Sequence, residues 1–114
     1  LIADDDEDVR LGVAAMAEAM GATVQAVASG SEALQQLRGA VIGLILVDLH
    51  LGDERGDELL PQLRALAPNA RVVLMTGSVE RADAPGGFDA VLIKPFGRDA
   101  LAGASRPAPG PAVG

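Results

Sequence analysis

Four short apolar runs in this chain are each followed by a polar or charged side chain, and this feature restricts the fold more than any other. A continuous apolar run followed by loop residues is typical of a strand that is buried on both faces, as in a parallel sheet. The runs and the residues that follow them are 1–3 with Asp4, 44–47 with Asp48, 72–75 with Thr76, and 90–93 with Lys94.

Helical patterns separate these runs. Strands are predicted over residues 1–3, 23–28, 44–48, 71–76 and 90–93, and helices over 7–20, 30–39, 57–67, 79–84 and 98–104. Asp6 and Ser29 stand where N-caps are expected. Apolar residues at helical spacing, including Met20 and Leu66, are expected to face the core. Pro61 requires that its helix begin close before it, because proline lacks a backbone donor.

The alternation of strands and helices predicts an α/β fold, a flavodoxin-like (βα)5 sandwich with a parallel five-stranded sheet. Right-handed crossovers favour the strand order 2-1-3-4-5. The polar residues of 23–28 suit an edge strand. The fourth and fifth helices are predicted to be short, because Pro85 and Pro107 follow them closely.

Length and composition restrict the function. The chain has 114 residues, no cysteine and a net charge of −7, so we expect one domain over residues 1–104, a Pro/Ala/Gly-rich linker or tail over 105–114, and no direct binding to nucleic acid. No apolar run approaches the roughly 20 residues of a membrane span, so no membrane segment and a cytoplasmic location are expected. Lys94 is the single lysine.

The residues after the strands converge, because the carboxyl ends of parallel strands share one edge of the sheet. Asp4, Asp5 and Asp48 are therefore expected to face Thr76 and Lys94. Close carboxylates repel each other unless a cation is present, and oxygen ligands without a His or Cys cluster suit Mg²⁺ or Mn²⁺. A hydroxyl and an ammonium opposite a carboxylate suit a phosphoryl group. A lone strand-ending aspartate, by contrast, more often caps a turn.

These motifs resemble the receiver domain of two-component response regulators. The resemblance covers residues 1 to about 104 and includes the residues after four strands. The matching motifs are Asp4-Asp5, Leu46-Val47-Asp48-Leu49 with Gly56 after the loop, Thr76-Gly77, and Lys94-Pro95-Phe96.

The resemblance implies a chemistry for the site. Asp48 would accept a phosphoryl group from a phosphohistidine of a histidine kinase or a histidine phosphotransfer protein. Lys94 would pair with the phosphoryl oxygens, and Thr76 would hydrogen-bond to the phosphoryl group. The domain would dephosphorylate itself slowly but would not be an enzyme with an outside substrate. A cis peptide bond before Pro95 is also implied.

The resemblance also implies a ligand set for the cation, Mg²⁺ or Mn²⁺. Asp5, Asp48 and the backbone carbonyl of His50 would bind it, and Asp4 would contribute through water. The His50 side chain is either an ordinary exposed loop residue or, with Ser78, a group that tunes dephosphorylation.

The sequence departs from the family at its output region. Val91 occupies the switch position, where the family usually has an aromatic residue, and a β-branched side chain is stiff. With two short helices, this favours a receiver fused to a kinase, as in a hybrid histidine kinase, or acting in a phosphorelay, over one that drives a DNA-binding dimer. The alternatives are a non-phosphorylated pseudo-receiver that binds proteins, and a phosphatase-like hydrolase, for which the chain lacks a cap domain.

Overall fold

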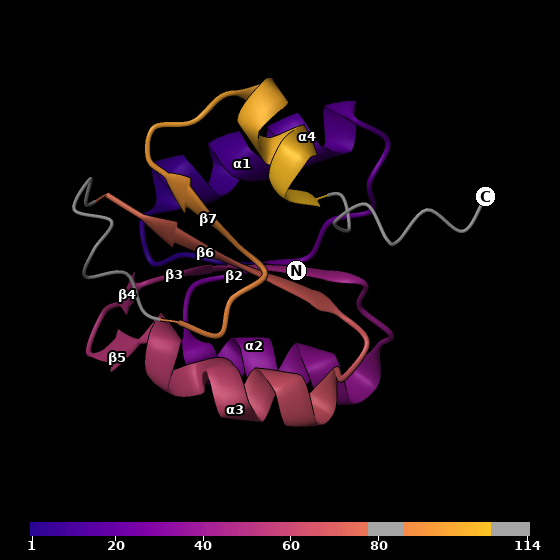
Figure 1. Ribbon diagram of the computed structural model, residues 1–114, viewed down its shortest axis with the longest axis vertical. Helices are drawn as coiled ribbons and strands as arrows, with labels where there is room; N and C mark the ends of the chain where they lie inside the picture. The colour runs from indigo at the N-terminus through magenta and orange to yellow at the C-terminus, as the bar shows by residue number, and fades with distance from the viewer. Residues whose placement is uncertain (78–85, 106–114) are drawn as a thin grey trace.

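The computed structural model describes residues 1–77 and 86–105, which form a parallel sheet between two layers of helices (Figure 1). The strands of the sheet are β1 (Ile2–Ala3), β2 (Ala26–Val27), β3 (Leu44–Asp48), β6 (Arg71–Thr76) and β7 (Ala90–Ile93). Their order is β2-β1-β3-β6-β7, with every neighbouring pair parallel. This is the predicted order 2-1-3-4-5, so the flavodoxin-like fold is confirmed.

The helices pack on both faces of the sheet, and their caps follow the sequence. They are α1 (Glu7–Ala19), α2 (Gly30–Gly39), α3 (Gly56–Leu66) and α4 (Arg98–Ser105). Figure 1 shows α1 and α4 on one face and α2 and α3 on the other. Asp6 accepts hydrogen bonds from the amides of Asp8 and Val9, and Ser29 accepts one from Glu32, so both predicted N-caps are confirmed.

Alternate residues of the central strands supply two separate cores. Ile45, Val47 and Val72 face α2 and α3, where they join the buried Leu59 and Leu63. On the other face, Leu46, Val73 and Met75 join Val13 of α1 and Leu101 of α4. Because both faces are covered, every residue of these runs must be apolar, which explains why the strands lack polar alternation.

A two-stranded hairpin replaces the loop predicted after β3. Its strands are β4 (His50–Leu51) and β5 (Glu54–Arg55), which pair antiparallel. Gly52 in the turn has φ +64°, a left-handed conformation that glycine adopts without strain. Leu51 is buried in the core beside α2 and α3, so the hairpin is anchored to the fold. Strands of two residues are too short to show a period in the sequence.

Other boundary predictions are corrected. Strand β2 has two residues rather than six, Met20 is the exposed C-cap of α1, and Leu66 is an exposed residue at the end of α3. Pro61 lies beyond the first turn of α3, because that helix begins at Gly56. Ser105, expected in the tail, ends α4.

Two predicted segments fall on residues outside the described ranges: the helix over 79–84 and the tail beyond Ser105. Within the described ranges, no helix has the length and apolar character needed to cross a membrane.

Candidate phosphoacceptor and cation site

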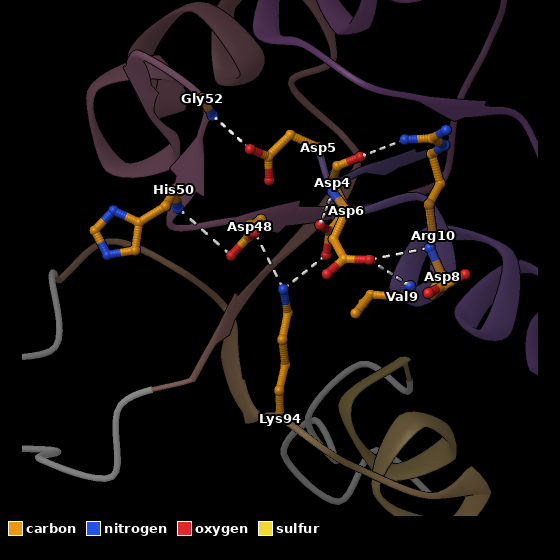
Figure 2. Close-up of polar contacts among 10 residues, drawn as sticks. All are labelled: Asp4, Asp5, Asp6, Asp8, Val9, Arg10, Asp48, His50, Gly52 and Lys94. Atoms are coloured by element: carbon orange, nitrogen blue, oxygen red, sulfur yellow. Dashed lines mark hydrogen bonds and ion pairs between the residues drawn. The ribbon is translucent and has the colours of Figure 1, made fainter.

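The side chains at the carboxyl ends of β1, β3 and β7 meet at one edge of the sheet, as predicted. Lys94 extends between two carboxylates (Figure 2). Its Nζ lies 2.7 Å from Oδ2 of Asp4 and 3.1 Å from Oδ2 of Asp48. One ammonium group therefore bridges the ends of two central strands.

Asp4 is the most enclosed member of the site, with no exposed surface. Its Oδ1 accepts a hydrogen bond of 2.9 Å from the amide of Asp6, and its carbonyl accepts one of 2.9 Å from Nη1 of Arg10 (Figure 2). These contacts fix the turn that leads from β1 into α1. The sequence motif identified Asp4 but did not reveal the part that Arg10 plays in holding it.

The charges of the site are incompletely balanced. Burial raises the pKa of Asp48, the Lys94 hydrogen bond lowers it, and the nearby charge of Asp4 raises it further, so the pKa lies above its usual value. Burial lowers the pKa of Lys94, but its hydrogen bonds to Asp4 and Asp48 outweigh burial and hold the pKa above its usual value. Lys94 is thus a permanent cation facing two carboxylates.

Asp5 completes the acidic cluster from a more exposed position. Its Oδ2 accepts a hydrogen bond of 3.0 Å from the amide of Gly52 in the hairpin turn. Asp4, Asp5 and Asp48 each offer a carboxylate oxygen, and these oxygens lie within 4.8 Å of one another. Three hard oxygen donors beside a single ammonium have the chemistry of a divalent-cation site. The cluster therefore fits the predicted type of metal.

Thr76 and His50 lie beside the cluster in different surroundings. Thr76 is 6% exposed, and its carbonyl accepts a hydrogen bond of 2.8 Å from the amide of Lys94. The His50 side chain is exposed, while its amide lies 3.4 Å from Oδ1 of Asp48. The Lys94–Pro95 peptide bond is cis, as the resemblance implied. Ser78, the other predicted tuning residue, lies outside the described ranges.

Val91, at the predicted switch position, is a partly exposed residue of β7 that pairs with Leu74 of β6. Ile93, two residues after Val91 in the same strand, pairs with Thr76. Its role in the output of the domain stays a prediction.

Gly56 lies against the backbone of Asp48 in a way that the sequence did not explain. A Cβ atom at this position would lie 2.2 Å from the Asp48 carbonyl oxygen. The Gly56 amide donates a hydrogen bond of 2.8 Å to the carbonyl of Leu49. Only glycine permits this approach, which closes the base of the hairpin beside the site. The sequence showed a glycine at the family position without the contact that requires it.

The fold and the side chains at its carboxyl edge define a doubly wound α/β protein with an acidic, lysine-bridged site. The sequence profile of the response regulator receiver domain matches residues 1–106. The chain belongs to this family, whose members are signalling modules of two-component systems.

Curated relatives contain this domain within longer chains. The protein is 32% identical to the C4-dicarboxylate transport transcriptional regulatory protein DctD of Rhizobium meliloti, over 90% of this chain and 23% of DctD. It is also 32% identical to the sensor kinase CckA of Brucella abortus, over 90% of this chain and 11% of CckA. The chain thus spans less than a quarter of either relative, and such relatives include both regulators and a kinase.

Solved structures share the same fold. A response regulator from Burkholderia pseudomallei, solved with a phosphorylated aspartic acid, a calcium ion and citrate, has a TM-score of 0.85 and 31% identity, over 92% of this chain and 64% of that one. A CheY-like receiver domain from Methanospirillum hungatei has a TM-score of 0.80 and 27% identity, over 90% of this chain and 85% of the other.

Proposed function

We propose that Asp48 accepts a phosphoryl group from a phosphohistidine of a histidine kinase or histidine phosphotransfer protein. The observation that supports this most is the Lys94 ammonium, which lies 3.1 Å from Oδ2 of Asp48 beside two further carboxylates. An Asp48 oxygen attacks phosphorus, the P–N bond to the imidazole breaks, and the released imidazole nitrogen takes up a proton. The product is an aspartyl phosphate.

The proposed site takes Mg²⁺ or Mn²⁺. Asp5, Asp48 and the backbone carbonyl of His50 would bind the cation, with Asp4 contributing through water. The cation supplies neutralisation of charge on the phosphoryl oxygens. The cluster of oxygens within 4.8 Å supports this assignment, as does the raised pKa of Asp48, because a cation there would compensate its charge.

Lys94 and Thr76 would then stabilise the product. Lys94 needs to turn only from the carboxylate of Asp48 toward a phosphoryl oxygen on the same side chain, because it is already within 3.1 Å. The Thr76 hydroxyl would donate a hydrogen bond to the phosphoryl group from the end of the adjacent strand. Attack by water on phosphorus would slowly regenerate the Asp48 carboxylate and release phosphate, so the domain would have no outside substrate.

Tuning of this dephosphorylation by His50 and Ser78 is also proposed. His50 has the position for it, because its side chain is exposed two residues after Asp48. The lifetime of the phosphorylated protein in His50→Ala tests the idea, and an unchanged lifetime would exclude His50 from this role.

For the whole protein, we propose a receiver fused to a kinase, as in a hybrid histidine kinase, or one acting in a phosphorelay. Helix α4 has only eight residues, and Val91 offers no aromatic switch, so the region that would report phosphorylation is small. Sedimentation of the phosphorylated and unphosphorylated chain tests this assignment. A dimer that forms only on phosphorylation would instead favour a fused output domain. The cytoplasmic location stays a prediction.

The experiment that tests the function uses the chain as it stands. It is incubated with Mg²⁺ and acetyl phosphate, and intact mass is measured. The wild type should gain one phosphoryl group, Asp48→Asn should gain none, and Asp53→Asn, which removes an exposed carboxylate of the nearby turn, should behave as the wild type. An unmodified wild type would contradict the proposal and favour the pseudo-receiver.

A further inference from the structure

The β4–β5 hairpin connects the acidic cluster to the N-terminal end of α2. At one end, the Gly52 amide donates a hydrogen bond of 3.0 Å to Oδ2 of Asp5. At the other end, Oε1 of Glu54 accepts a hydrogen bond of 3.0 Å from the amide of Gly30, the first residue of α2. Two residues of one hairpin thus contact the acidic cluster and the start of α2.

The contact between Glu54 and α2 is closely fitted. The first amides of a helix have no partner within the helix, and a carboxylate at this end is favoured by the helix dipole. A Cβ atom on Gly30 would lie 2.6 Å from Oε2 of Glu54 and 2.6 Å from Cδ1 of Leu59, so any larger residue here would make these two side chains shift. Ser29 supplies the other cap of this helix through the Glu32 amide. Glu54 therefore caps the Gly30 amide, whereas Ser29 caps the Glu32 amide.

Asp5 depends on the hairpin for its orientation. Its side chain is exposed, so packing does not hold it, and the Gly52 amide is its one hydrogen-bond partner among the contacts of the described ranges. That contact occupies one carboxylate oxygen and leaves the other for a cation. Anything that holds the turn in place therefore also holds a proposed cation ligand.

We propose that Glu54 is a positioning residue for the cation site, because it holds the hairpin where the Gly52 amide orients Asp5. This inference rests on the proposed function of the cluster. Glu54 does not touch the cation but acts through the hairpin and Asp5. By thermodynamic reciprocity, a Glu54–Gly30 contact that strengthens cation binding must itself be strengthened when the cation binds.

The first experiment measures Mg²⁺ affinity by isothermal titration calorimetry. Partners of metal ligands typically contribute about 10–100-fold to affinity, and Glu54 is one step further away, so Glu54→Ala should bind Mg²⁺ about three- to tenfold more weakly. Glu54→Gln should recover most of the affinity, because its amide oxygen can still accept from Gly30. Glu58→Ala, which removes an exposed carboxylate from α3, controls for lost charge and should bind as the wild type.

The second experiment uses hydrogen exchange and needs no Glu54 variant. Saturating Mg²⁺ should slow exchange of the Gly30 amide in the wild type by about the same three- to tenfold factor. In Asp5→Asn, saturated with Mg²⁺, this slowing should disappear because the connection passes through Asp5. A purely structural Glu54 would leave Gly30 exchange insensitive to Mg²⁺.

The outcomes separate the two proposals. A wild type that binds no Mg²⁺ overturns the proposed cation site and, with it, this inference. A wild type that binds Mg²⁺ as tightly as Glu54→Ala does, or whose Gly30 exchange ignores Mg²⁺, overturns the role of Glu54 alone. Should Glu54→Ala fail to fold, the Gly30 measurement on the wild type decides the question.

Discussion

The two edges of the sheet use the same kind of ion pair for opposite purposes. At the carboxyl edge, Lys94 faces both Asp4 and Asp48, and the pKa of Asp48 is raised by burial and by the charge of Asp4. At the amino edge, Asp89 before β7 accepts from the amide of Val72 and from Arg64, and these bonds lower its pKa.

The two edges differ in how many donors and positive charges are available to their carboxylates. Arg64 also donates to the carbonyls of Gly87 and Ala70, so this arginine has more donors than the Asp89 carboxylate alone requires. The carboxyl edge has three carboxylates around one lysine. The amino edge is thus satisfied and holds the fold together, whereas the carboxyl edge keeps unneutralised charge that a cation or a phosphoryl group can use.

Removal of the lysine should have the largest effect on stability. Lys94→Ala leaves the buried Asp4 and its neighbour Asp48 without a cation, which should lower the free energy of unfolding by about 3 kcal/mol in Mg²⁺-free buffer. Urea unfolding measures the loss. Added Mg²⁺ should recover part of it, and Lys94→Arg, which keeps the charge, should lose much less. Equal stability of wild type and Lys94→Ala would mean that the carboxylates do not depend on Lys94.

Loss of the carboxylate at the amino edge should be the next largest effect. Asp89→Ala leaves the buried Val72 amide without its side-chain acceptor and removes the partner of Arg64, which should cost about 1–3 kcal/mol. Phosphorylation by acetyl phosphate should persist in the folded variant, because the other edge is untouched. Asp53→Ala is the control, as Asp53 is an exposed turn residue. If Asp89→Ala also lost phosphorylation while folded, the two edges would not be independent.

Loss of a carboxylate charge at the carboxyl edge should instead raise the free energy of unfolding. Asp48→Asn removes one of two carboxylates that share Lys94, so stability in Mg²⁺-free buffer should rise by about 0.5–2 kcal/mol, as at other sites that trade stability for function. Thermal unfolding of wild type and variant in a chelator measures the gain. A destabilised Asp48→Asn would show that Lys94 already balances the site.

Much of the fold was predictable because burial dictates it residue by residue. The central residues of β3, β6 and β7 are apolar since helices cover both faces of the sheet. Asp6 and Ser29 cap helices through contacts two to three residues away. Exposure at helix ends was less predictable. Met20 and Leu66 follow the apolar spacing, but each lies at the end of its helix and is exposed.

The convergence of the site was likewise predictable, because topology alone places strand ends together. What supports the site was not. Glu54 meets Gly30 across 24 residues, and Arg64 meets Asp89 across 25, with no pattern in the sequence to announce either pair. Such contacts depend on where the hairpin and α3 lie in space. The hairpin itself escaped prediction because its four strand residues are too few to show a period.

The smallest expected effect is the pH dependence of the amino edge, and it tests the direction of the Asp89 shift. Hydrogen bonds from the Val72 amide and Arg64 lower the pKa of Asp89 in the folded state, so the unfolded chain takes up its proton first as pH falls. The stabilisation from the Asp89 carboxylate is therefore complete when the pH is above the pKa of Asp89 in the unfolded chain, about 3.9. It is lost as the pH falls through the lower pKa of Asp89 in the folded protein. Partial exposure of both side chains keeps the effect small.

Urea midpoints of wild type and Asp89→Asn, measured from about pH 6 down to about pH 2, should differ most at the upper end and converge at the lower end. Asp53→Asn, which neutralises an exposed carboxylate, controls for the change in net charge and should run parallel to the wild type. If the Asp89→Asn curve also ran parallel, the Asp89 carboxylate would stabilise the fold as a hydrogen-bond acceptor alone. Its charge would then contribute nothing, and the two edges would differ in geometry rather than in electrostatics.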